Sequence, residues 1–306
     1  MSAPAPGGIL VPLDGSEVAE QALAVGASRA RKAGATLHLV SVHEPMPLVG
    51  MPPDFPAVMP DLEEQTRANL AEYLESVAAV ARASLATPVI TSVVTGAAAA
   101  ALCEYVESHS VGLVVMTTHG RGGLSRWWLG SVADRMLRRL EVPVLLLQPR
   151  DVAQPTEFRR ILVALDGEIE EPVVDAAFAL GGPAPPARYV FTRVVEPTIP
   201  VLSGFAARPG HLPPNWNEVR EIEARNYLAR LTDRLRADGL DATSQVLVGR
   251  GIAGQVLELA DAIGTDCIVA GTHGARGMER LVLGSVADKI VRGAKVPVLV
   301  VPVRQR

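Results

Sequence analysis

The residues best suited to chemistry lie in two glycine-containing loops that each end in a Gly-Ser pair. In the second loop, nine residues separate Gly271-Thr272-His273-Gly274 from Gly284-Ser285, where a helix is expected to begin. Glycine lacks a Cβ, so its backbone N–H can approach a ligand closely. A helix start adds unpaired N–H donors and the positive end of the helix dipole, and both suit a phosphate. The alternative is structural, with glycine turning the chain and serine capping the helix.

The first loop repeats this arrangement with one change. Gly120 is again separated by nine residues from Gly130-Ser131, but Thr117 stands where the second loop has Gly271. Because the composite pattern occurs twice with the same spacing, it favours phosphate binding over capping alone. We expect the Cβ and hydroxyl of Thr117 to narrow the first site or to change its backbone geometry.

A carboxylate follows the first apolar run of each half of the chain. Asp14 and Asp166 both precede a glycine directly after such a run. At the end of a buried strand, a carboxylate can accept hydrogen bonds from ribose hydroxyls or an adenine amine. The alternative is an Asx turn. Val42 and Val194 end the next runs, where their backbone could pair with an adenine edge.

Several other signals are weaker. "GRGIAG" at 249–254 fits the G-x-G-x-x-G dinucleotide pattern, but the other half has "GAAAAA" there, which favours a tight turn into a helix. His119 and His273 recur, yet no cluster of Cys, His or carboxylates has metal-ligand spacing, so we expect no metal site. Glu168, Glu170 and Glu171 would oppose a polyphosphate unless a metal ion or an arginine screens them. The Pro-rich segments 44–60 and 196–214 are long enough to be flaps or partner surfaces.

The elements that must position these residues form an internal repeat. "ILVPLDG" at 9–15 recurs as "ILVALDG" at 161–167, and "LGSVAD" follows both glycine loops. Asp14 and Asp166 are 152 residues apart and Gly130 and Gly284 are 154 apart, which one small insertion explains. We therefore expect two copies of one domain, at 1–149 and 157–306, joined by a linker at 150–156.

Within copy one, short apolar runs alternate with helical segments. Strands are predicted at Ile9–Leu13, Thr36–Val42, Val89–Val94, Leu113–Met116 and Val144–Leu147, and helices at Ser16–Ala33, Asp61–Ala86, Ala97–His109 and Ser131–Leu140. This alternation predicts right-handed β-α-β units and a doubly wound, five-stranded parallel sheet flanked by helices. Such sheets bind ligands beyond the carboxyl ends of their strands, where the strand order reverses.

Composition restricts the class of protein further. The 306 residues are 48% hydrophobic and only 4% aromatic, as expected of parallel sheets built from Val, Leu, Ile and Ala. The net charge of −4 argues against a general nucleic-acid binder, and no apolar run is long enough to span a membrane. Cys103 and Cys267 form no CxxC motif and are expected to be buried thiols in a reducing, cytoplasmic protein.

The "LDG" after the first strand, the G-x2-G-x9-G-[ST] loop and the closing "VPVL" strand resemble those of the universal stress protein family, in its tandem form. The resemblance covers nearly the whole chain and implies an adenine nucleotide α-hydrolase-like fold. It implies ATP as ligand, with or without Mg²⁺, and a regulatory role in stress or growth. It also implies that the last strands of the two copies pair into an intramolecular pseudo-dimer, which could dimerise further.

The resemblance assigns residues of both copies to the expected nucleotide sites. In copy one they are Pro12, Asp14, Val42, Met116, His119, Gly120, Gly130, Ser131 and Val132. In copy two they are Ala164, Asp166, Val194, Ala270, Gly271, His273, Gly274, Gly284, Ser285 and Val286.

Catalysis has no comparable support in the sequence. It contains no Walker A lysine, nucleophile–base pair or carboxylate pair for two metals. We therefore expect a binding protein, at most a slow ATPase. The alternative is a protein-interaction module whose nucleotide sites have degenerated; an enzyme on the same fold would need a further motif.

Overall fold

The computed structural model describes residues 7–45, 59–118, 129–167, 171–182, 186–197, 216–272 and 283–303. Copy one contains β1 (Gly8–Pro12), α1 (Glu17–Ala33), β2 (Leu37–His43), α2 (Met59–Ser84), β3 (Val89–Thr95), α3 (Ala98–Ser108), β4 (Val111–Thr117), α4 (Ser131–Leu137) and β5 (Val144–Leu147). Copy two contains β6 (Arg160–Ala164), α5 (Glu171–Gly181), β7 (Arg188–Val195), α6 (Trp216–Ala237), β8 (Asp241–Val248), α7 (Ile252–Ile263), β9 (Cys267–Thr272), α8 (Ser285–Gly293) and β10 (Val298–Pro302). All nine elements predicted for copy one are present, with ends shifted by at most three residues.

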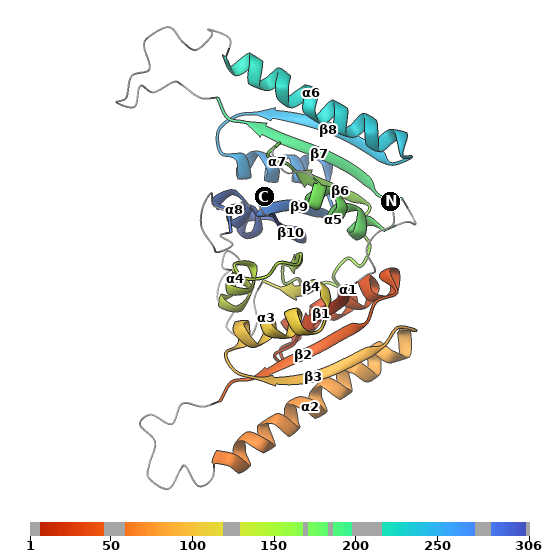
Figure 1. Cartoon of the computed structure of the whole chain (residues 1–306), viewed down its shortest axis with the longest axis vertical. Coiled ribbons are helices and arrows are strands. Elements are labelled where there is room, and N and C mark those ends of the chain that lie inside the picture. The colour runs from red at the N-terminus through yellow and green to blue at the C-terminus, as the bar shows by residue number, and fades with distance from the viewer. Residues whose placement is uncertain are drawn as a thin grey trace, which may run out of the picture.

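The strands form one continuous sheet in the order β3-β2-β1-β4-β5-β10-β9-β6-β7-β8. Within each copy all neighbouring strands are parallel, in the doubly wound order. β5 and β10 pair antiparallel, with Leu145 opposite Leu299. The expected pairing of the last strands of the two copies is therefore present. It joins the copies into a pseudo-dimer at the centre of the sheet (Figure 1).

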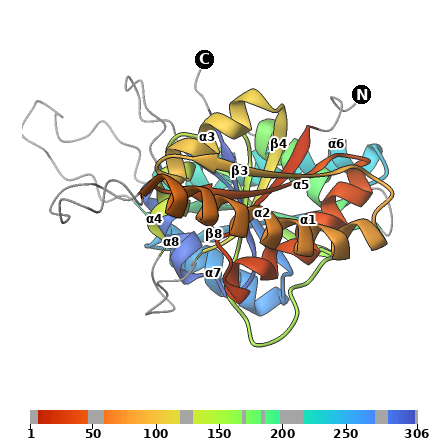
Figure 2. The ribbon, with the colours of Figure 1, turned by 90° about the horizontal axis from the view of Figure 1, so that it is seen from below.

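Helices cover both faces of this sheet (Figure 2). One apolar core joins the sheet to α1, α2, α5 and α6, and a second joins the opposite face to α3, α4, α7 and α8. Leu145 and Leu299 belong to the first core, whereas Leu146 and Val300 belong to the second. Because strand residues alternate between faces, each core continues through both copies.

Helix α1 shows how local sequence sets an element that borders a predicted site. Ser16 is its N-cap, and the serine Oγ accepts a hydrogen bond from the backbone N–H of Ala19. Glu17 and Glu20 lie in the first turn, where their negative charges stabilise the helix by interacting with the positive end of its dipole. Gly34 ends the helix with a left-handed backbone at φ 62°. The expected helix start at Ser16 is thus a cap, and the helix itself begins one residue later.

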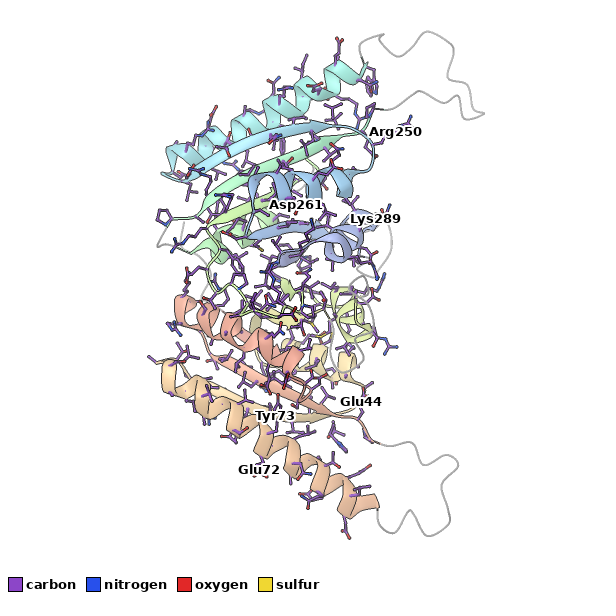
Figure 3. All side chains as sticks on the ribbon, turned by 180° about the vertical axis from the view of Figure 1, so that it is seen from behind. Glu44, Glu72, Tyr73, Arg250, Asp261 and Lys289 are labelled. Atoms are coloured by element: carbon purple, nitrogen blue, oxygen red, sulfur yellow. The ribbon has the colours of Figure 1, made fainter. Side chains whose placement is uncertain are left out.

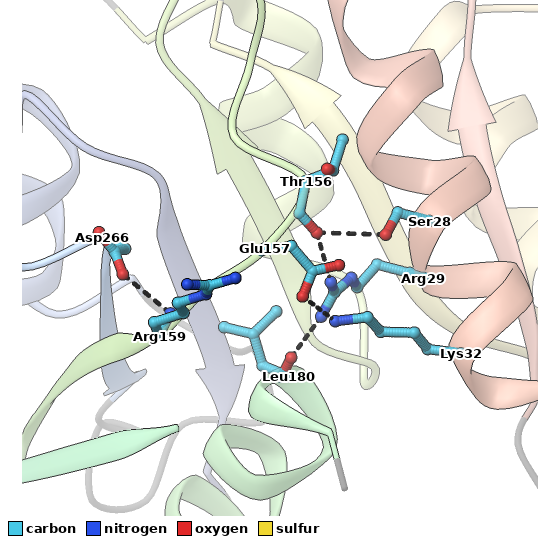
Figure 4. A network of polar contacts seen from close by, with 8 residues as sticks. All are labelled: Ser28, Arg29, Lys32, Thr156, Glu157, Arg159, Leu180 and Asp266. Atoms are coloured by element: carbon cyan, nitrogen blue, oxygen red, sulfur yellow. Dashed lines mark hydrogen bonds and ion pairs between the residues drawn. The ribbon is translucent and has the colours of Figure 1, made fainter. Parts of the chain in front are cut away.

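The segment joining the copies is hydrogen-bonded to both of them (Figure 4). The buried guanidinium of Arg29 in α1 donates from Nη2 to the Thr156 carbonyl at 2.6 Å, and from Nη1 to the Leu180 carbonyl at the end of α5. Lys32 pairs with Glu157 at 2.5 Å. Burial lowers the pKa of Arg29, while the charge of Glu157 opposes this shift.

On the other side of this segment, Asp266 holds the start of β6. One carboxylate oxygen, Oδ2, accepts from the backbone N–H groups of Arg159 and Arg160, each at 2.8 Å. Copy one has Gly112 at this position, and a Cβ there would lie 3.0 Å from the Cα of Gly7. The difference between the copies at this point therefore has a structural cause.

Both cysteines are buried and free, as expected. Burial raises the pKa of Cys103 to about 11 and also raises that of Cys267, so both thiols stay protonated at neutral pH. Across the described ranges, none of the helices combines the length and apolar character needed to cross a bilayer.

Candidate functional site

The sheet order reverses between β6 and β9 in copy two, and a cleft opens at the carboxyl ends of these strands. Its volume is about 360 Å³, which falls within the usual range for small-molecule sites. β6, β7 and β9 lie side by side there, with Ala164 opposite both Thr192 and Ala270. The cleft is thus found where doubly wound sheets generally bind ligands.

Six of the residues predicted for copy two line this cleft. They are Ala164, Asp166, Val194, Ala270, Gly271 and Val286. Leu165, Ile252, Ala287 and Ile290 extend the apolar part of its wall, while Asp166 and Thr272 add polar groups. An apolar surface with a few convergent polar groups suits a nucleoside, whose base is flat and whose sugar carries hydroxyls.

In copy one, the predicted residues lie at or next to the ends of neighbouring strands. Pro12 closes β1, Val42 lies in β2 and Met116 in β4, and both β2 and β4 pair with β1. β2 and β7 each run one residue beyond Val42 and Val194, to His43 and Val195. The valines are therefore the penultimate strand residues, which corrects the expectation that they end the strands.

Asp14 forms the Asx turn that was one of its two expected roles. Its Oδ1 accepts from the Ser16 backbone N–H at 3.0 Å and from the Ser16 hydroxyl at 2.6 Å. The same serine caps α1, so the carboxylate, the turn and the helix start are one connected unit. Asp166 lines the cleft at the corresponding place, and Gly15 and Gly167 both have positive φ after these aspartates.

The two Gly-Ser pairs begin α4 and α8 in the same manner. Gly130 and Gly284 are the N-caps, and neither helix has a side-chain cap hydrogen bond. Ser131 and Ser285 are exposed first helical residues, so the alternative that serine caps the helix is wrong for both. Gly130 N–H donates to the Thr118 carbonyl at 2.7 Å, which brings the two ends of the first glycine loop together.

Gly271 has a packing role in addition to its place in the cleft wall. A Cβ built on it would lie 2.9 Å from Cγ2 of Val303 and 3.1 Å from Cγ2 of Val173. In copy one, Thr117 occupies the same position and is buried. Gly271 is therefore required by its apolar neighbours, a cause distinct from close approach to a ligand.

Several predicted residues lie outside the described part of the chain. These include the loop positions His119, Gly120, His273 and Gly274, the acidic residues Glu168 and Glu170, and most of both Pro-rich segments. Val132 and Val286 follow the exposed serines in α4 and α8 and are partly buried against the second core.

Sequence reasoning missed three charged residues of the cleft in copy two. Arg193 comes from β7, and Arg220 and Glu223 come from the same face of α6. Arg193 adjoins Val194, but copy one has Ser41 in its place, so the repeat gave no signal. Only the packing of α6 against β7 and β8 brings Arg220 and Glu223 to the strand ends.

Sequence reasoning also missed Glu44 and Glu196, although the repeat marks them, since a glutamate followed by proline occurs at this position in both copies. The Glu44 carboxylate accepts from the Ala98 N–H at 2.7 Å, and that of Glu196 accepts from the Gly251 N–H at 2.8 Å. Figure 3 shows Glu44 and Arg250 on the same side of the molecule, toward the strand ends. Each glutamate thus satisfies a donor at the start of α3 or α7.

This arrangement also explains the "GRGIAG" segment. Gly251 is the N-cap of α7 with φ 79°, and its N–H is already bonded to Glu196. A carboxylate therefore sits where a dinucleotide phosphate would have to bind, in agreement with the tight-turn interpretation. In the residues that the structure describes, no three His, Cys, Asp or Glu side chains are grouped to hold a metal ion.

Comparison with known proteins gives consistent matches. The model of the universal stress protein family matches residues 8–148 and 157–302. A universal stress protein of Mycolicibacterium smegmatis is 27% identical over 96% of both chains. One from Mycobacterium tuberculosis is 27% identical over 63% of this chain, which spans 62% of that relative. The crystal structure of a universal stress protein from Archaeoglobus fulgidus superposes with a TM-score of 0.65 at 20% identity, covering 96% of this chain and 98% of that one.

Proposed function

Because the chain belongs to the universal stress protein family, we propose that it is a nucleotide-binding regulator whose ligand is ATP. The observation that carries this proposal is the cleft of copy two, which gathers six independently predicted residues at the strand-order reversal. We assign it a role in stress response or growth control in the cytoplasm. The two units would be 1–149 and 157–306.

The residues of this cleft fit an adenine nucleotide. The apolar wall formed by Ala164, Val194 and Ala270 would contact the base, and Asp166 would accept hydrogen bonds from the sugar hydroxyls or the base amine. The exposed start of α8 at Ser285 offers N–H donors to a phosphate. As a ligand, ATP is charged and hydrolysable, and its concentration reflects the energy state of the cell.

Mass spectrometry of the denatured, purified protein tests this proposal directly. We expect adenine nucleotide to be released, and calorimetry on the nucleotide-free chain to detect ATP binding. Two nucleotides per chain would indicate that both copies bind, and one would indicate a single competent copy. If no nucleotide is released and calorimetry detects no binding of ATP, the proposal is wrong and the interaction-module alternative gains support.

Assembly and hydrolysis need separate measurements. Since β5 and β10 already pair within the chain, a homodimer would have to use another surface. Light scattering at several concentrations would detect it. A phosphate-release assay would distinguish a slow ATPase from a protein that only binds ATP. The activity should be lost together with nucleotide binding in an Asp166→Asn variant.

A further inference from the structure

Two arginines of the cleft in copy two have no cationic counterpart in copy one. We propose that Arg193 and Arg220 bind the anionic part of the nucleotide and make this site select nucleotides over nucleosides. The inference rests on the proposed function and deepens it. It places an anion-binding wall on β7 and α6, separate from the helix start at Gly284-Ser285 that the sequence pattern indicates.

The guanidinium of Arg193 is held by two neighbours. A Cβ on Gly167 would lie 2.5 Å from both Cζ and Nη1 of Arg193, so the guanidinium packs directly against the turn that follows Asp166. Its Cζ also lies 5.7 Å from the centroid of the Tyr227 ring. Among the described residues, no carboxylate forms an ion pair with Arg193. Its N–H donors are therefore oriented by packing and remain available in the cleft.

Arg220, in α6, is held in place by a hydrogen bond to the chain just beyond the end of β7. Its Nη1 donates to the Glu196 carbonyl at 2.9 Å, in the turn that follows β7. Glu196 in turn caps α7 through its carboxylate. A guanidinium is planar and carries five N–H donors, so an arginine can bind a ligand with part of this fork while other donors bind the protein.

The charges of the cleft explain why these arginines matter for an anion. Asp166 and Glu223 bring two negative charges to the same cleft, and Arg193 and Arg220 balance them. Without the arginines, a phosphorylated ligand would meet carboxylates alone and would be repelled. An arginine can also bind phosphate oxygens in a bidentate manner, which adds direct hydrogen bonds to the charge balance.

Copy one has no cation at either position. The counterpart of Arg193 is Ser41, whose hydroxyl is bonded to the Leu13 carbonyl at 2.7 Å. The counterpart of Arg220 is Thr66, because the buried residues of α2 and α6 align in that register; its hydroxyl is bonded within α2 to Leu62. Copy one therefore shows which residues stand at these positions when the two arginines are absent.

The test compares ATP with adenosine by calorimetry on the full-length protein. The variants Arg193→Ser and Arg220→Thr each introduce the residue of copy one. Arg230→Ala removes an exposed cation from α6 that does not line the cleft, and serves as the control. We expect each cleft variant to weaken ATP binding at one site by roughly tenfold or more, and the double variant by more, since charged hydrogen bonds are lost. Adenosine affinity should stay within about twofold, as should both affinities of the control.

Three results would count against the inference. ATP affinity unchanged in the double variant would overturn it, and so would equal losses for ATP and adenosine, which would indicate a general distortion of the cleft. Loss of ATP selectivity only on Ser285→Ala would assign the anion to the Ser285 hydroxyl at the helix start instead. Absence of ATP binding by the unmodified protein would overturn the proposed function as well, whereas the other results leave it intact.

Discussion

Arg29 in copy one donates a hydrogen bond to the carbonyl oxygen of Thr156 at 2.6 Å, so the first copy holds the segment that leads into the second. The same guanidinium reaches the Leu180 carbonyl and lies 5.2 Å from the centroid of the Phe158 ring. Its position is therefore determined by both copies together. This contact adds a polar link between α1, which begins beside Asp14, and the second copy to the pairing of β5 with β10.

Removal of this guanidinium should destabilise the protein. Arg29→Met keeps most of the side-chain length but leaves two carbonyl oxygens without their donor, which should lower the free energy of unfolding by about 2–4 kcal/mol. Urea unfolding measures the loss, and Arg31→Met at an exposed position of the same helix is the control. Equal midpoints for the two variants would show that the contact contributes little.

A second stability effect should depend on pH through His38. Burial, with a smaller contribution from the charge of His109, lowers its pKa below 6.5, and its Nδ1 lies 3.0 Å from the Tyr105 hydroxyl. The unfolded chain therefore binds a proton more readily than the folded one as pH falls below about 6.5. The contribution of neutral His38 to the free energy of unfolding should be fully present above that pH. It should decline as the pH falls from about 6.5 toward the lowered pKa of the folded state.

The variant His38→Val tests this because copy two has Val190 at the corresponding place. Unfolding free energies measured between pH 7.5 and 5 should fall less steeply for the variant than for the unmodified protein. His109→Gln should reduce the slope by a smaller amount, since it removes only the lesser cause. A slope that His38→Val leaves unchanged would exclude this histidine as the titrating group.

The fold was largely predictable from the sequence, because buried parallel strands are short apolar runs and the repeat supplied each of them twice. Cleft residues were predictable where a repeated motif marks them, near a strand end as for Asp166 and Ala270, or at a helix start as for Val286. Arg193 and Arg220 belong to different elements and meet only through tertiary packing, and copy one does not repeat them. No local pattern could have revealed that pair.

Gly271 was predicted as a ligand-contacting residue, and the structure gives a packing reason for glycine at this position. The sequence pattern assigned its missing Cβ to close approach of a ligand, whereas Val303 and Val173 fill that space. Gly271→Ala should therefore destabilise the nucleotide-free protein by about 1–3 kcal/mol, as overpacking commonly does. Thermal unfolding without ligand measures it, and Gly271→Ala combined with Val303→Ala should recover part of the loss. If Gly271→Ala weakened nucleotide binding while leaving stability unchanged, the ligand explanation would be the right one.

The two roles of Asp14 can be separated by a pair of substitutions. Asn keeps a side-chain oxygen that can accept from the Ser16 N–H, whereas Ala removes the acceptor, so only Asp14→Ala should lose the Asx turn and about 1 kcal/mol of stability. If Asp14 also binds the sugar or base of a nucleotide, Asp14→Asn should weaken ATP binding to copy one without changing the unfolding midpoint. Calorimetry and urea unfolding of both variants provide the two readouts. Asp14→Asn with unchanged affinity at both sites would assign the carboxylate to the turn that leads into α1 and not to the nucleotide.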